Sequence, residues 1–254
     1  MVRMRMAIKT ICFAGLLTMV VASPGLILGE SASVLEVGRF STEKEDKGLP
    51  THWETLSFRG IKQHTDYRLV EEKGQVIVRA LADVSASGLI RKINIDPREY
   101  PIVQWRWKIT TILKGGNVYQ KDGDDYPARF YILFKYNPDK LGFFEKIKYE
   151  AIKLLYGEYP PLASITYIWA SNAPEDMVVP NPYTKKAMMF VVESGKKNLN
   201  RWLTEERNVY DDYREVFKDE PPMISAVAIM TDTDNTGESA TTYYGDILFL
   251  KERP

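Results

Sequence analysis

Two acidic segments contain the residues whose types and spacing could do chemistry. The first is residues 231–238, TDTDNTGE. Positions one, three, five and six of a calcium-loop pattern are filled by Asp232, Asp234, Thr236 and Gly237. Position twelve is Tyr243 rather than glutamate, so the pattern lacks its closing carboxylate. Asp232, Asp234 and Glu238 are therefore candidate calcium ligands, and a tight polar turn that caps backbone groups is the alternative interpretation.

The second segment is residues 121–129, KDGDDYPAR, which places three acids within four positions. Neighbouring carboxylates raise each other's pKa unless a cation intervenes, and Arg129 is the natural partner. Asp124, Asp125 and Arg129 are candidate ligand-binding residues for a cation, a sugar hydroxyl or a basic group. Paired carboxylates could also act as acid and base in glycoside cleavage. A solvated hairpin loop explains the same composition.

Further candidates come from a strand pattern and from two loops. In residues 102–109, IVQWRWKI, the two tryptophans share one face and Arg106 projects from the other, where it could bind a carboxylate or a planar group. Aromatic and amide side chains follow later strand patterns, as is common in sugar-binding clefts. These add Trp169, Asn181 and Tyr183 to the predicted ligand-binding set.

The elements that must position these residues are mostly strands. Short alternating or apolar runs, separated by Gly, Pro, Asn and Asp, predict strands. The predicted strands are residues 75–80, 102–109, 128–135, 164–170, 187–193, 224–230 and 246–250. Their spacing favours a jelly-roll-like antiparallel β-sandwich over alternating β-α units.

Two segments have helical rather than strand periodicity. Residues 141–155 place Phe144, Ile147, Ala151 and Leu155 on one stripe, and residues 198–217 place Trp202, Val209, Tyr213 and Phe217 at helical spacing. We expect two peripheral α-helices packed on the sandwich edge. The first could instead lie on a membrane surface.

The amino terminus predicts export. Basic residues precede an apolar run, residues 11–22, which ends in Ala22 before Ser-Pro-Gly. This order is typical of a secretion signal. We predict a signal and short leader over residues 1–32, with cleavage after Ala22 and a later cut near Gly29 or Ala32 as the alternative. One domain then covers residues 33–254, in the periplasm or outside the cell. An uncleaved leader would instead act as a membrane anchor.

Composition excludes several classes of protein. The one cysteine, Cys12, lies in the predicted leader, so the mature chain has neither disulfides nor thiol chemistry. Removing the basic leader leaves a slightly acidic chain, which argues against nucleic-acid binding. With His52 and His64 as the only histidines, a His-rich zinc site is impossible.

Seven segments taken in order resemble the bacterial DUF3047 family of uncharacterised exported proteins. They are Leu49-Pro50 with Trp53, residues 85–89, 105–108, 123–126 with 128–129, 167–169, 181–184 and 230–237. The resemblance covers nearly the whole predicted mature chain, and it transfers no functional residue. It implies a sandwich similar to galactose-binding or concanavalin-like jelly rolls, which often bind carbohydrate; this step is fold-level analogy.

Three functions follow as hypotheses. The leading one is an exported binding protein for a carbohydrate or another envelope ligand. The second is a polysaccharide-acting enzyme that pairs Asp124 or Asp125 with an acid of the Asp232 loop. The third is a structural envelope protein whose helices are partner surfaces, which exposed apolar area on the 141–155 helix would favour.

Overall fold

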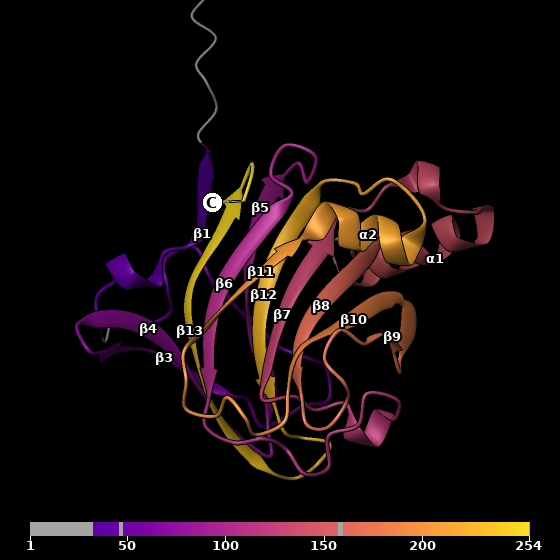
Figure 1. Cartoon of the computed structure of the whole chain (residues 1–254). Helices are drawn as coiled ribbons and strands as arrows, with labels where there is room; N and C mark the ends of the chain where they lie inside the picture. Colours follow the sequence, from indigo (N-terminus) through magenta and orange to yellow (C-terminus); the bar gives the residue numbers. More distant parts are fainter. Residues whose placement is uncertain (1–32, 46–47, 157–159, 254) are drawn as a thin grey trace, which may run out of the picture. The chain divides into compact units, whose positions relative to one another are not determined.

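Two β-sheets packed face to face make up most of the molecule (Figure 1). The structure is a computed structural model that describes residues 33–45, 48–156 and 160–253. The predicted signal, its cleavage site and Cys12 lie outside the described residues. Within them, no helix has the length and apolarity needed to cross a membrane.

The first sheet has the order β11-β6-β13-β4-β3, and β1 pairs with β13 beside this path. Its strands are β1 (Val34–Gly38), β3 (Asp66–Glu72), β4 (Gln75–Asp83), β6 (Ile102–Ile109), β11 (Leu203–Asn208) and β13 (Ser239–Leu250). Neighbouring strands in this sheet are antiparallel.

The second sheet has the order β2-β5-β12-β7-β8-β10-β9. Its strands are β2 (Glu54–Leu56), β5 (Ala86–Ile95), β7 (Ala128–Phe134), β8 (Ala163–Ala170), β9 (Val178–Asn181), β10 (Thr184–Ser194) and β12 (Ile224–Asp232). The pairing of β10 with β8 is parallel, so this sheet departs from the fully antiparallel expectation. The segment that joins them leaves β8, forms the edge strand β9 and returns along β10.

The core between the sheets is built largely from aromatic side chains. Trp105 of β6 stacks on Tyr167 of β8 with ring centroids 4.9 Å apart, and it also contacts Phe130 of β7 at 5.0 Å. Trp107 is fully buried and meets Trp105 edge-on. Because successive residues of a strand face opposite sides, the buried Trp105 and Trp107 place Arg106 on the outer face of the first sheet.

The β-sandwich with two α-helices among the described residues confirms the predicted fold class. The predicted strand segments coincide with β4, β6, β7, β8, β10, β12 and the end of β13. Three short 3-10 helices, η1 (Phe40–Thr42), η2 (Lys121–Gly123) and η3 (Pro138–Lys140), lie in connections.

The prediction of one helix over residues 198–217 is wrong in its first half. Residues 203–208 form β11 and pair with β6, and only α2 (Val209–Phe217) is helical. Asn208 ends the strand and caps the helix, because its side chain accepts a hydrogen bond from the amide of Asp211. Backbone pairing with an exposed sheet edge therefore decides the state of the segment before Asn208.

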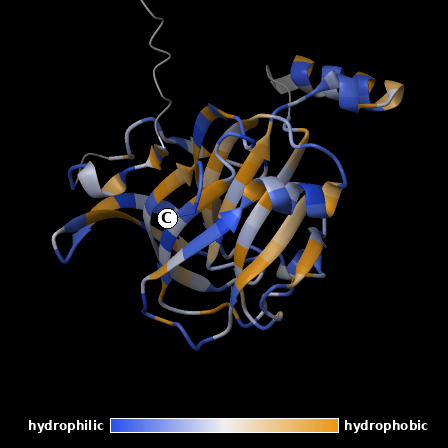
Figure 2. Ribbon diagram, turned by 45° about the horizontal axis from the view of Figure 1, so that its top comes forward, coloured by the Kyte–Doolittle hydropathy of each residue, from blue (hydrophilic) through white to orange (hydrophobic). Residues whose placement is uncertain are grey.

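The helix α1 (Phe143–Tyr156) forms where the sequence predicts it, but its packing differs from the prediction. Tyr149 holds it to the body by stacking on Tyr136 and donating to the carbonyl of Pro161. Phe144 and Ile147, expected to pack on the sandwich edge, are 84% and 52% exposed. Figure 2 shows α1 standing away from the sheets.

Candidate functional site

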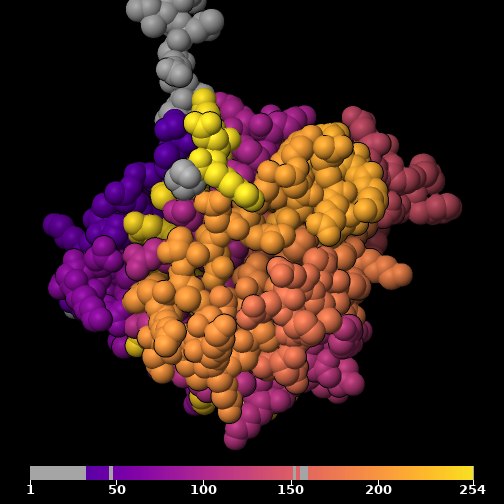
Figure 3. All heavy atoms as spheres, in the orientation of Figure 1, coloured from indigo at the N-terminus to yellow at the C-terminus, as the bar shows by residue number. Residues whose placement is uncertain are grey.

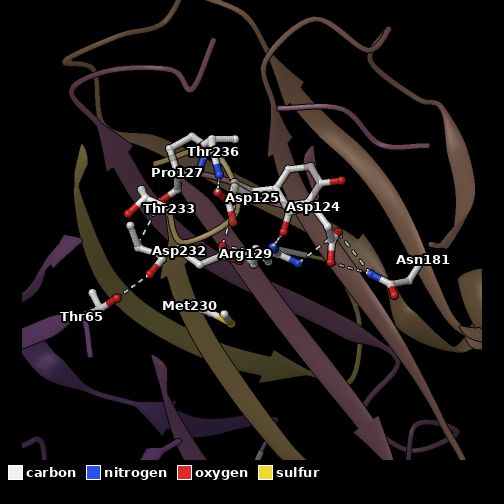
Figure 4. Close-up of polar contacts among 12 residues, drawn as sticks. Thr65, Asp124, Asp125, Pro127, Arg129, Asn181, Met230, Asp232, Thr233 and Thr236 are labelled. Carbon is white, nitrogen blue, oxygen red and sulfur yellow. Dashed lines mark hydrogen bonds and ion pairs between the residues drawn. The ribbon is translucent and has the colours of Figure 1, made fainter. Parts of the chain in front are cut away.

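The candidate site is a polar cluster centred on Asp124, Asp125, Arg129, Asn181 and Asp232 (Figure 4). Phe130 of β7 and Ile229 of β12 face the core, so Arg129 and Met230, which pair across the two strands, face outward. Asp232, two residues after Met230, shares this outer face. The antiparallel pairing of β7 and β12 thus places Arg129 beside Asp232, although they are far apart in sequence.

A loop that joins β6 to β7 covers this cluster. Val118 and Tyr126 of the loop pack with Ile168, Met189 and other apolar side chains into a second core. This core lies outside the second sheet, because Tyr167 and Phe190, the neighbours of Ile168 and Met189, face the main core. The burial of Val118 and Tyr126 therefore fixes the loop that carries the two adjacent acids.

Arg129 is the centre of the cluster and is 3% exposed. Its Nε donates to Asp232 Oδ1 at 2.9 Å, and its Nη2 donates to Asp232 Oδ2 and to the carbonyl of Asp124. Its Nη1 donates to the hydroxyl of Tyr131 at 3.3 Å, and its guanidinium lies over the ring of Tyr126. Burial alone would lower the pKa of Arg129, but Asp232, Tyr131, Asp124 and Tyr126 together outweigh burial and raise it. The guanidinium is therefore permanently charged.

Asp125 is fully buried beside this pair. Its Oδ2 accepts a hydrogen bond from the amide of Thr236 at 2.6 Å, whereas its Oδ1 is buried without a hydrogen-bond partner. Burial raises the pKa of Asp125, although the hydrogen bond from the amide of Thr236 opposes the shift, and the charge of Asp234 raises it further. The carboxyl is thus held in an environment that disfavours its charge without a cation.

Three carboxylates converge at this point, from Asp125, Asp232 and Asp234. Each offers an oxygen, and these oxygens all lie within 4.8 Å of one another. Asp234 is half-buried, so it forms the side of the group nearest to solvent. The two acidic segments identified in the sequence therefore meet in space.

A second part of the cluster lies around Asp124, which is 7% exposed and is bordered by exposed side chains. The side-chain amide of Asn181, at the end of β9, donates to both carboxylate oxygens of Asp124 at 3.2 and 3.3 Å. Tyr183 is 57% exposed, and Lys121 lies over its ring at 5.1 Å. Tyr119 is 67% exposed and its hydroxyl contacts Met177, which precedes β9. Asp124 is thus bordered by an amide and by exposed aromatic side chains.

The structure does not bring three of the sequence candidates to this cluster. Arg106 lies on the outer face of the first sheet, where it stacks over Trp202. Trp169 is fully buried and donates its indole N–H to the carbonyl of Gly195, so it belongs to the core. Glu238 accepts hydrogen bonds from the amides of Lys114 and Gly115. It therefore holds that loop in place and is not one of the three converging carboxylates.

Sequence reasoning missed several residues that complete the cluster. The outward side of β7 carries Tyr131, which contacts Arg129, and its alternation with Phe130 was visible in the sequence. Thr236 lay within the calcium-loop pattern, but its role as amide donor to Asp125 required the tertiary fold. Tyr119 carried no signal, since an isolated loop tyrosine is common.

The fold and this cluster define a class: a two-sheet β-sandwich with a buried arginine among carboxylates at one end. The chain belongs to the family described as "Protein of unknown function (DUF3047)", whose model matches residues 51–248. A comparison with curated proteins found no match.

Two solved structures are similar at low identity. "Cellulose induced protein, Cip1" has a TM-score of 0.34 and 10% identity, over 80% of this chain and 93% of its own. The "Spr0440 glycoside hydrolase domain, Endo-D from Streptococcus pneumoniae R6" has a TM-score of 0.32 and 9% identity, over 80% of this chain. The chain spans only 22% of that second protein.

Proposed function

We propose that this protein is an exported binding module that recognises a saccharide on the surface around Asp124. The observation that carries this proposal is the Asp124–Asn181 pair beside the exposed ring of Tyr183. A sugar offers hydroxyl groups that both donate and accept, together with apolar C–H faces. A carboxylate and an amide satisfy the hydroxyls, and an exposed aromatic ring can pack on the apolar face.

The surface favours an extended ligand over a small molecule in a deep cavity. Two hollows among the described residues lie elsewhere: one is lined by Phe190, Arg207 and Glu215, the other by Tyr136 and Pro221. Neither contains a residue of the polar cluster. An open surface with two exposed tyrosines suits a chain of sugar units better than a single one.

Cleavage of a polysaccharide is less well supported than binding. A working acid-base pair must reach the bond that it cleaves. Asp124, Asp125 and Asp232 are 7%, 0% and 2% exposed, so none of the three carboxyls reaches the surface freely. We therefore place binding first.

Binding to a glycan array, followed by calorimetry on the best ligand, tests the proposal. We expect Tyr183→Ala and Asn181→Ala each to weaken binding about tenfold, which corresponds to about 1.4 kcal/mol. The matched control is Phe144→Ala, which removes an exposed aromatic side chain from α1. No binding to any envelope polysaccharide, or equal affinity in all three variants, would refute it.

The exposed apolar face of α1 favours a second role, attachment to a membrane surface. At 100° per residue, Phe143, Phe144, Ile147 and Leu154 lie on one side of the helix, opposite Tyr149, which contacts the body. These four side chains are 52–88% exposed. Figure 3 shows α1 projecting beyond the rest of the surface.

The charges of α1 fit an anionic lipid surface. Lys146, Lys148 and Lys153 flank the apolar side. Of the two acids of α1, Glu145 is paired with Lys186, and the exposed Glu150 lies at the edge of the apolar side next to Phe143. Apolar side chains bordered by lysines are typical of helices that lie in the interface of an anionic membrane. We therefore propose lipid, rather than a protein partner, as the occupant of this face.

Vesicle sedimentation tests this second role. We expect a chain that begins at Ser33 to bind vesicles containing phosphatidylglycerol and to bind pure phosphatidylcholine less. Phe144→Asp should abolish binding, whereas Tyr183→Ala should not change it. Equal sedimentation of the wild type and Phe144→Asp would contradict the role.

A further inference from the structure

We propose that Asp125, Asp232 and Asp234 form a site for one hard divalent cation, which calcium fits best. The site lies next to the proposed saccharide surface but does not depend on it. It differs from the calcium loop expected from the sequence, because Asp125 replaces Glu238.

The spacing of the oxygens suits calcium. Calcium binds oxygen ligands at about 2.3–2.6 Å, so two ligands of the same ion lie at most about 5 Å apart. The converging oxygens of the three aspartates satisfy this limit, since all lie within 4.8 Å of one another. Magnesium demands near-ideal octahedral geometry at about 2.0–2.1 Å, whereas calcium accepts irregular sets of oxygen ligands.

The unpartnered oxygen of Asp125 is an independent indication of a ligand. Buried polar atoms in proteins are almost always hydrogen-bonded, because an unsatisfied one loses its interaction with water. Asp125 is fully buried, yet its Oδ1 has no hydrogen-bond partner, while its Oδ2 is held by the amide of Thr236. A cation held with Asp232 and Asp234 would satisfy this oxygen.

The charges of the cluster leave room for a cation. Among the residues that the structure describes, the guanidinium that contacts the cluster is that of Arg129, which bonds to Asp232 and lies 3.5 Å from a carboxylate oxygen of Asp124. Asp125 and Asp234 add two further carboxylates. Like charges at this separation disfavour ionisation of one another, and a divalent ion removes that repulsion.

The ligand atoms and their access also indicate the class of ion. The converging group consists of carboxylates alone, and oxygen ligands of this kind suit calcium or magnesium rather than softer metals. Asp234 is half-buried and follows the buried Thr233 at the start of an exposed turn. An ion could therefore enter from the solvent side of Asp234.

Thermal unfolding of the EDTA-treated protein, with and without calcium chloride, tests this site. At a hundredfold excess over Kd, we expect calcium to raise the Tm by about 5–10 °C. Asp234→Asn should remove most of this rise, and so should Asp125→Asn. The matched control is Asp122→Asn, an exposed acid of the same loop, which should keep the full rise.

Terbium luminescence gives a second measurement that does not depend on stability. Tyr126 lies beside Arg129, so its ring can sensitise a terbium ion bound in the cluster. We expect a signal that calcium displaces and that Asp234→Asn weakens at least tenfold. Asp234 is the safer variant, since it is less buried than Asp125 and its replacement disturbs the fold less.

Several results would overturn the proposal. One is the lack of any Tm change with calcium, magnesium or manganese together with no displaceable terbium signal. Another is an equal calcium effect in Asp234→Asn and Asp122→Asn. If Asp125→Asn raises stability and no metal binds, Asp125 is a protonated structural acid and the site does not exist.

Discussion

Replacement of Arg129 by methionine is the sharpest test of how the cluster is held together. Methionine keeps much of the volume but removes every hydrogen bond that the guanidinium gives to Asp232, Asp124 and Tyr131. Asp232, which is 2% exposed, then keeps a buried charge without a counter-ion. Removing one partner of a buried ion pair costs about 3–5 kcal/mol. That is a large part of the roughly 5–15 kcal/mol by which proteins of this size are stable.

The loss of stability in Arg129→Met should depend on pH in a definite direction. Burial raises the pKa of Asp232 even in the wild type, with Asp125 adding to the shift, and loss of Arg129 raises it further. A carboxyl whose folded-state pKa is raised destabilises the fold progressively as pH rises above the unfolded-state value of about 3.9. The deficit of Arg129→Met should therefore grow as pH rises through the wild-type pKa of Asp232, about 8, and be smaller at about pH 6 than at about pH 9.

Urea denaturation at both pH values measures this effect. The control is Arg129→Met combined with Asp232→Asn, which removes both charges and should recover part of the loss. A double-mutant cycle then gives the coupling between the two residues, which we expect to exceed about 1 kcal/mol. A loss below about 1 kcal/mol in the single variant, or strict additivity in the double variant, would refute this reasoning.

Three further predictions follow from other contacts. Burial raises the pKa of Glu205 to about 7, although the indole N–H of Trp107 opposes the shift, so its ionisation destabilises the fold as pH rises from about 4.5 to 7. Partial exposure of Glu205 reduces the size of this effect, so we expect Glu205→Gln to stabilise the protein by about 1–2 kcal/mol at about pH 8 and by almost nothing at about pH 4. Equal urea midpoints for the two proteins at the higher pH would contradict this. A Cβ on Gly123 would lie 2.8 Å from the amide nitrogen of Asn117. We therefore expect Gly123→Ala to lower the free energy of unfolding by about 1–3 kcal/mol and to weaken ligand binding at Asp124. An unchanged urea midpoint would show that the loop adapts. Glu238→Ala should cost about 1 kcal/mol by freeing two loop amides, and hydrogen exchange should rise at residues 114 and 115 while β6 stays protected.

The alternation of apolar and polar residues in the sequence determined most of the strands and which side of each strand faces the core, because each strand face is buried as a unit. The alternation in residues 102–109 predicted that Trp105 and Trp107 face the core and that Arg106 faces outward, as observed. The alternation in β7 likewise separated Phe130 from Arg129. Such faces can be read from sequence because a strand repeats every two residues.

Periodicity failed where tertiary contacts compete with local preference. Residues 203–208 have helical spacing, yet they form β11 because the edge of β6 offers backbone partners. The apolar stripe of α1 predicted burial, but its described members Phe144 and Ile147 are exposed, whereas Tyr149 on the opposite face contacts the body. A periodic pattern in the sequence identifies an apolar face of a helix, but it does not determine which surface packs against that face.

The candidate site shows the same division. Its acids and Arg129 stood out in the sequence as two separate segments, because unusual densities of charge are visible in composition. Only the tertiary structure decided that β7 and β12 lie side by side, which brings Arg129 to Asp232 and Asp125 to Thr236. It also excluded Arg106 and Trp169, since the outer face of the first sheet and the core are physically separate from this end of the second sheet. Contacts between residues more than a hundred positions apart depend on which strands pair, and strand pairing is set by the packing of the whole sandwich rather than by local sequence.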